Sequence, residues 1–217
     1  MPEILEPTGQ DAPTFSAEDI GGVIDLLLGR VVRLVGHGRR AELLNERFLH
    51  HMFSWELGKL CERKGADMWD RLLLAPECPS DQKFRWDFIN LDDDEATRQN
   101  AVGIGKSGNL DFLIKAAPAV AIEWKGPLLY QPQDVVEALL KLVTQQPETI
   151  KVFAAIITSS TTGRRDHMEK TRRYFQEGVA CIKRVQQFTT LRGLNLFAFI
   201  ATVPDKGATK IHWGPVD

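Results

Sequence analysis

Two acids and a lysine lie within an otherwise apolar stretch near the middle of the chain. Residues 108–127, GNLDFLIKAAPAVAIEWKGP, have the pattern of two apolar strands around a short turn, yet they include Asp111, Glu123 and Lys125. Carboxylates are the ligands that Mg²⁺ and Mn²⁺ prefer, and a lysine beside them can hold an attacking water molecule or neutralise a pentavalent phosphorane. The residue types therefore indicate metal-assisted hydrolysis.

A three-residue turn at 116–118 would set the two acids directly opposite each other. A slip by one residue would place apolar side chains against polar partners, so the hydrophobic pattern selects this register. Asp111 and Glu123 then have Cβ atoms about 4.5–5.5 Å apart, which is destabilising unless a cation lies between them, and we expect Mg²⁺ or Mn²⁺ there. The apolar pairs of this register are Ile114 with Val120, Phe112 with Ile122, Leu110 with Trp124 and, on the other side, Leu113 with Ala121.

Lys125 follows Glu123 by two positions, so the period of a strand places both side chains on one face. The small residues Ala119 and Ala121 leave space beside these charges. The alternative interpretation is an ion-pair cluster on a solvated sheet face, which is the usual role of single acids and lysines. Two acids opposed in register and followed by the E-x-K spacing favour the catalytic interpretation.

These residues resemble the motif of the PD-(D/E)xK phosphodiesterase superfamily, whose fold is the restriction-endonuclease-like sheet. The segment NLD supplies Asp111, and EWK matches the second half of the motif with Glu123 and Lys125. The expected element order over residues 39–158 is similar to the α-β-β-β-α-β core of that family. The resemblance implies Mg²⁺-dependent cleavage of DNA or RNA, with the acids and the main-chain carbonyl of Trp124 as metal ligands and Lys125 placing the water.

The resemblance also implies a further acid, because many members add one from the first core helix. Glu46 in the segment NERFLHH is the candidate, with Glu42 one turn earlier, and the alternative is a solvated helix face. His50 and His51 are adjacent and therefore point to different faces of a helix, so no zinc site is indicated.

Two basic segments are candidates for contact with a phosphate backbone. Residues 102–108, VGIGKSG, lack the first glycine of a phosphate-binding loop and run directly into the hairpin, so Lys106 is expected to meet a phosphate from a flexible loop. Residues 161–175, TTGRRDHMEKTRRYF, carry Arg164, Arg165 and Lys170, which could hold a nucleic acid without reading its sequence. The alternative is an ordinary helix face balanced by its own acids.

The composition bounds the class of protein. The 217 residues are 43% hydrophobic and 26% charged, with a net charge of -2, which suits one globular domain and excludes a uniformly basic surface. Three distant cysteines without CxxC spacing indicate neither a disulfide framework nor a zinc site, so a reducing, cytoplasmic setting is expected. The first residues lack the features of a signal peptide, and no run is long enough to cross a membrane.

The periodicity predicts an α/β fold in which helices flank both faces of a central mixed β-sheet. Residues 1–15 are expected to be a loose tail, residues 16–38 an N-terminal helix that serves the core or a dimer, and residues 39–217 the nuclease-like domain. Within that domain we expect a helix ended by Gly65, a strand at 83–91, the hairpin, a helix from Pro132, a strand at 150–158, a helix to about residue 188 and a final strand at 194–203.

The sequence thus predicts a Mg²⁺- or Mn²⁺-dependent nuclease that acts on DNA, with RNA a less favoured substrate. Asp111 and Glu123 would hold the metal with support from Glu46, and Lys125 would place the water. The alternative is a nuclease-like module that has lost catalysis and serves in nucleic-acid binding or assembly. A homodimer that cuts two strands is a further expectation, based on the apolar stripe of the first helix.

Overall fold

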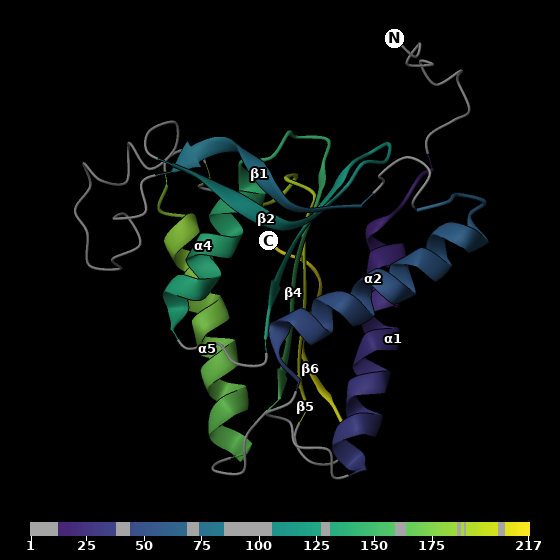
Figure 1. Cartoon of the computed structure of the whole chain (residues 1–217). Helices are drawn as coiled ribbons and strands as arrows, with labels where there is room; N and C mark the ends of the chain where they lie inside the picture. Colours follow the sequence, from purple (N-terminus) through teal and green to yellow (C-terminus); the bar gives the residue numbers. More distant parts are fainter. Residues whose placement is uncertain are drawn as a thin grey trace.

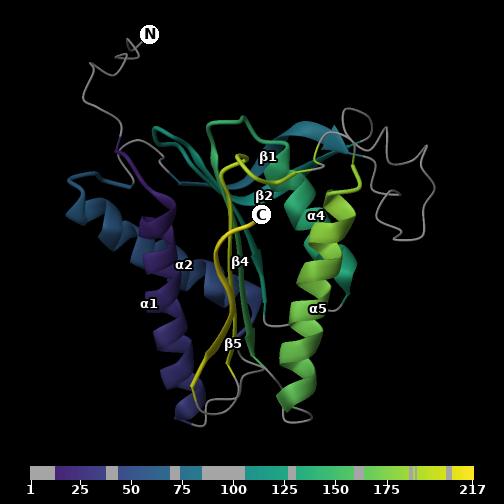
Figure 2. The same ribbon diagram turned by 180° about the vertical axis from the view of Figure 1, so that it is seen from behind.

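A six-stranded mixed β-sheet forms the centre of the molecule, with α1 and α2 on one face and α4 and α5 on the other (Figure 1). The view from behind shows the same layers (Figure 2). The computed structural model describes residues 13–37, 44–68, 74–84, 106–126, 131–158, 164–185, 188, 190–203 and 207–217, without the side chains of 81–84, 106–107 and 164–167. The predicted α/β class and the flanking helices are therefore confirmed.

The described elements follow one another along the chain in the order helix, helix, three strands, helix, strand, helix and two strands. Their bounds are α1 Ala17–Gly36, α2 Glu46–Arg63, β1 Leu74–Phe84, β2 Lys106–Ile114, β3 Val120–Lys125, α4 Pro132–Val143, β4 Ile150–Thr158, α5 Arg164–Ile182, β5 Leu196–Val203 and β6 Thr209–Pro215. The stretch from α2 to β4 has the order α-β-β-β-α-β.

The six strands lie in the sheet in chain order, from β1 to β6. β3, β4 and β5 are parallel to one another, and the remaining neighbours are antiparallel. The parallel connections run through α4 and α5, as crossover connections do. Because β3 and β4 are parallel, the chain leaves both strands at the same edge of the sheet.

α1 belongs to the same core as the sheet. Ser16 caps the start of the helix with the predicted capping box, in which Asp19 N–H donates to Ser16 Oγ at 3.2 Å and Ser16 N–H donates to Asp19 Oδ2 at 2.9 Å. Its apolar stripe, including Ile20, Ile24 and Leu27, is fully buried against α2, β4 and β5. Phe15, the last residue of the predicted tail, is also buried. The apolar stripe of α1 therefore packs against other elements of the same chain.

The sequence also predicts an inward stripe on α2 at Leu44, Phe48, Met52, Trp55 and Leu60, and this expectation was only partly right. Leu44 and Leu60 are buried, but Phe48 is 37% exposed and Trp55 is 63% exposed. Leu49, Phe53 and Leu57, at every fourth residue, complete the inward face. Both stripes are apolar, so hydrophobicity alone did not fix the rotation of the helix. The helix ends where expected, before Gly65, which has a φ of 70°.

The two edge strands escaped prediction because they contain residues that usually interrupt strands. The first strand is β1 rather than 83–91, and residues 85–91 lie outside the described part of the chain. β1 contains Pro76 and Pro79, and unpredicted β6 contains Gly214 and Pro215. β1 and β6 lie at the two ends of the sheet, where a missing N–H donor can face outward.

The other elements lie close to their predicted bounds. α4 and β4 match the helix from Pro132 and the strand at 150–158, and β5 falls within 194–203. α5 ends at Ile182 rather than near 188, because the amides of Arg184 and Val185 turn to the carbonyls three residues before them. No described helix is long and apolar enough to cross a membrane. Cys61, Cys78 and Cys181 are not joined in disulfides.

Candidate metal centre

The central hairpin has the predicted register. Phe112 pairs with Ile122, Leu113 with Ala121 and Ile114 with Val120, around the turn at 116–118. Beyond these pairs, side chains replace the backbone ladder. Asp111 N–H donates to Glu123 Oε1 at 3.3 Å, and Trp124 N–H donates to Asp111 Oδ2 at 2.6 Å. Each acid therefore binds the backbone of the opposite strand, and the two predicted acids do lie together.

The expected pair of Leu110 with Trp124 does not form. Leu110 packs with α4 and α5, whereas Trp124 packs with α1 and α2 on the other face of the sheet. The strict alternation of β2 therefore breaks near Asp111. As a result, the carboxylate of Asp111 lies near α2, and that of Glu123 lies near α4.

Asp111 forms a group with two side chains from the start of α2. One ligand atom from each of Glu46, His50 and Asp111 lies within 4.8 Å of the other two. Glu46 Oε2 also accepts from Gly126 N–H at 3.3 Å, which ties α2 to the end of β3. His50 Nε2 is buried and has no hydrogen-bond partner among the described residues. The predicted ligand Glu46 is thus beside Asp111.

His50 was missed because it was considered together with its neighbour His51 as a possible zinc ligand. The signal that could have found it is its spacing from Glu46: residues four apart lie on the same helix face. The structure places the side chains of Glu46 and His50 together, whereas His51 is exposed.

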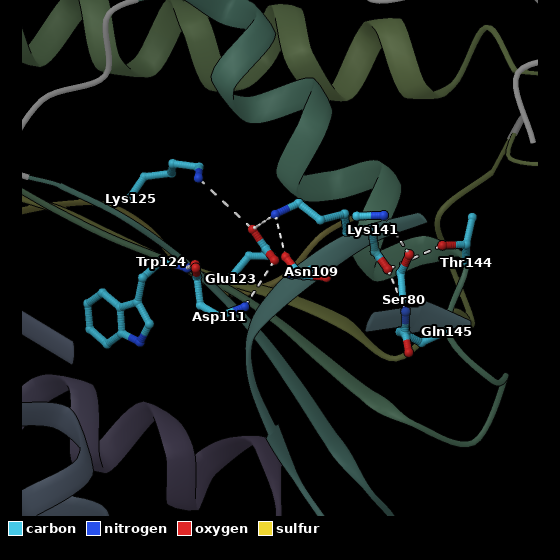
Figure 3. A network of polar contacts seen from close by, with 10 residues as sticks. Ser80, Asn109, Asp111, Glu123, Trp124, Lys125, Lys141, Thr144 and Gln145 are labelled. Carbon is cyan, nitrogen blue, oxygen red and sulfur yellow. Dashed lines mark hydrogen bonds and ion pairs between the residues drawn. The ribbon is translucent and has the colours of Figure 1, made fainter. Parts of the chain in front are cut away.

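Glu123 is fully buried and lies between two lysines (Figure 3). Lys141 Nζ, from the last turn of α4, is 2.7 Å from Glu123 Oε2 and also donates to the carbonyl of Asn109 at 2.9 Å. Lys125 Nζ is 4.0 Å from the same Glu123 oxygen. Lys125 therefore reaches the site as predicted, while Lys141 was not predicted because a lysine at the end of an amphipathic helix is usually solvated.

Burial sets the proton affinity of these groups. Desolvation raises the pKa of Glu123 to about 8, Asp111 adds to this rise, and Lys141 and Lys125 oppose it. Desolvation also raises the pKa of Glu46, against the effect of Lys125. For Lys125, desolvation lowers the pKa, but the surrounding acids, Glu123 first, outweigh it and raise the pKa overall. Lys125 is therefore a cation at neutral pH.

This donor set suits a divalent cation. Carboxylates from Glu46 and Asp111 suit Mg²⁺ or Mn²⁺, and an imidazole nitrogen favours Mn²⁺ over Mg²⁺. The unpartnered, buried His50 Nε2 is the kind of atom that a metal would satisfy. Glu123 contacts the same group through the amide of Asp111, but both of its oxygens already accept hydrogen bonds within the chain.

The predicted phosphate-binding residues are only partly described. Lys106 begins β2, and Arg164 and Arg165 begin α5, which follows the end of β4 where it leaves the sheet. Their side chains lie outside the description. Lys170 Nζ lies 5.3 Å from the centre of the Tyr174 ring. The neighbouring Arg172 and Arg173 pair with the acids Glu169 and Glu177 of the same helix, as the alternative of a balanced helix face expects.

Comparisons of this chain with protein-family models, with curated proteins and with solved structures found no match. The functional interpretation therefore depends on the geometry and chemistry of the site.

Proposed function

We propose that this chain is a Mg²⁺- or Mn²⁺-dependent nuclease of the PD-(D/E)xK type that hydrolyses phosphodiester bonds of DNA in the cytoplasm. The observation that carries the proposal is the end of the central hairpin, where Asp111 and Glu123 bind each other's strand beside Lys125. The order α-β-β-β-α-β from α2 to β4 supports a restriction-endonuclease-like fold.

The side chains have distinct roles in this proposal. Asp111, Glu46 and His50 hold the metal, with Glu123 completing its surroundings. The cation would lower the pKa of a bound water molecule and neutralise charge on the phosphate. Lys125 donates hydrogen bonds to the attacking water and stabilises negative charge that develops on the phosphate. Because its pKa is raised, it acts as a cation and a donor rather than as a base.

The test is cleavage by the purified protein of plasmid, linear and single-stranded DNA and of RNA, with Mg²⁺, Mn²⁺ or EDTA. We expect metal-dependent cleavage of DNA, reduced at least about 100-fold in Lys125→Met, since the lysine acts on charge in the transition state. Lys115→Met is the matched control, because Lys115 is exposed at the turn of the same hairpin. The proposal is wrong if the wild type and Lys125→Met release the same background products.

One observation favours a second candidate, a nuclease-like module without catalysis. Lys141 Nζ already lies 2.7 Å from Glu123, where its ammonium can take the place of a metal. Titration calorimetry with Mn²⁺ separates the two functions, using Asp111→Asn to remove one carboxylate while keeping an oxygen. An inactive module should bind DNA but show no Mn²⁺ binding that this substitution removes.

A further inference from the structure

Lys141 has a position that the lysine of the E-x-K motif does not have. Its ammonium group donates to Glu123 on β3 and to the carbonyl of Asn109 on β2, at 2.7 and 2.9 Å (Figure 3). It therefore joins the two strands just where their backbone ladder has ended. Lys125 is farther from the same carboxylate, at 4.0 Å.

A buried carboxylate needs a positive partner close to it. Glu123 is completely buried, and an unpaired charge in that position would be strongly destabilising. Among the described residues, Glu123 Oε1 accepts one long hydrogen bond, from the Asp111 amide at 3.3 Å, whereas Oε2 has the short contact with Lys141. The side chain of Lys141 is itself only 12% exposed, so solvent screens the pair little.

We propose that Lys141 is a positioning residue that serves as the built-in counter-cation of the metal centre. In the metal-free chain its ammonium supplies the charge that holds Glu123 and the separated ends of β2 and β3 in place. A divalent cation held by Asp111, Glu46 and His50 would add positive charge near Glu123, whose Oε1 accepts from the Asp111 amide, so the ammonium and the metal repel each other. This inference rests on the proposed function, because it requires that the centre binds a metal.

The inference predicts that removing the charge of Lys141 lowers the stability of the metal-free protein and raises its affinity for a metal. Replacing Lys141 by methionine removes the nearer of the two lysines from buried Glu123, which lowers the melting temperature in EDTA. The same change removes the repulsion between the ammonium and the metal, so Mn²⁺ should bind at least about tenfold more tightly. Mn²⁺ should then raise the melting temperature of Lys141→Met by more than that of the wild type.

The experiment measures Mn²⁺ affinity by titration calorimetry, and melting temperature with and without Mn²⁺, for the wild type, Lys141→Met and Lys141→Arg. The measurements use an oxygen-free buffer. Its pH of about 9 limits competition between the metal and a proton on Glu123. Lys141→Arg retains the charge and should keep the affinity of the wild type. Lys115→Met is the control for a change in net charge far from the site, and it should leave both quantities unchanged.

Each outcome decides the matter. The inference is wrong if folded Lys141→Met binds Mn²⁺ no more tightly than the wild type does. Lys141 would then have a purely structural role. If Lys141→Met is unfolded in EDTA, folding on addition of Mn²⁺ supports the inference, and failure to fold with Mn²⁺ overturns it. If the wild type itself binds no Mn²⁺, the proposed function fails, which is a different result.

Discussion

The buried carboxyl group of Glu123 makes the stability of the metal-free protein depend on pH. Its pKa rises from an ordinary value near 4.5 to about 8, because burial and Asp111 outweigh Lys141 and Lys125. The folded state therefore holds this proton more tightly than the unfolded state. The resulting stabilisation is complete below the unfolded pKa and is lost as the pH rises through about 8.

We predict that the free energy of unfolding of the wild type falls relative to that of Glu123→Gln between about pH 5 and pH 8, by roughly 1 kcal/mol per pH unit. The neutral amide of the variant has no proton to lose. Denaturant unfolding in EDTA over this pH range measures the difference. Parallel curves for the two proteins would show that Glu123 stays ionised throughout.

His50 gives a prediction about the choice of metal. Imidazole is a better ligand for Mn²⁺ than for Mg²⁺, so His50→Gln should weaken Mn²⁺ binding about tenfold or more and reduce the preference for Mn²⁺. His51→Gln is the matched control, because His51 is exposed on the next position of the same helix. Calorimetric titrations with both metals provide the measurement. Equal affinities for the two variants would remove His50 from the metal centre.

At the scale of elements, Gly126 joins the end of β3 to α2 and β4. A Cβ atom at this position would lie 2.9 Å from the carbonyl oxygen of Ile156 and 2.9 Å from Leu49 Cδ1, and the amide of Gly126 donates to Glu46. We predict that Gly126→Ala lowers the free energy of unfolding by about 1–3 kcal/mol and reduces metal affinity, since Glu46 shifts with the strand.

Gly29→Ala is the control for this substitution. Gly29 lies on α1, where an added Cβ would meet nothing within 4 Å, so alanine should raise stability by up to about 1 kcal/mol. Thermal or denaturant unfolding compares the two variants. A Gly126→Ala protein as stable as the wild type would mean that β3 moves freely relative to α2.

The elements that the sequence predicted well are those with one strong local signal. The capping box at Ser16 and the apolar pairs of the central hairpin defined α1, β2 and β3. The rotation of α2 depends on which of two apolar stripes fits the sheet, and this is a matter of tertiary packing. The edge strands β1 and β6 tolerate proline only because of their places in the sheet, which local sequence does not reveal.

The same distinction applies to the site. Asp111, Glu123 and Lys125 are close together through strand pairing, so short-range pattern was enough to bring them together. Lys141 and His50 come from two different helices, and only packing on opposite faces of the sheet places them near the acids. Their identities could therefore not be derived from the motif.

At the scale of the whole molecule, α1 is a layer of the fold rather than an addition to it. Its apolar stripe is buried in the same cluster as α2 and the sheet, so the stripe that suggested a dimer is occupied within one chain. We predict that Ile24→Ala lowers the free energy of unfolding by about 2–5 kcal/mol, while Leu26→Ala, at a 49% exposed position, changes it little.

Unfolding measured at several protein concentrations tests this assignment. The loss caused by Ile24→Ala should be independent of concentration, because the contacts it removes lie within one chain. A loss that grows on dilution would instead place α1 between two copies.

The hydrogen bonds between each acid and the opposite strand have a consequence for how inactive variants are made. Trp124 N–H and Asp111 N–H depend on the two carboxylates, so alanine in place of either acid leaves a main-chain donor unsatisfied inside the protein. Loss of activity in such a variant would mix damage to the fold with loss of chemistry. Selection against unfolding alone would therefore preserve both acids, whether or not they take part in any reaction.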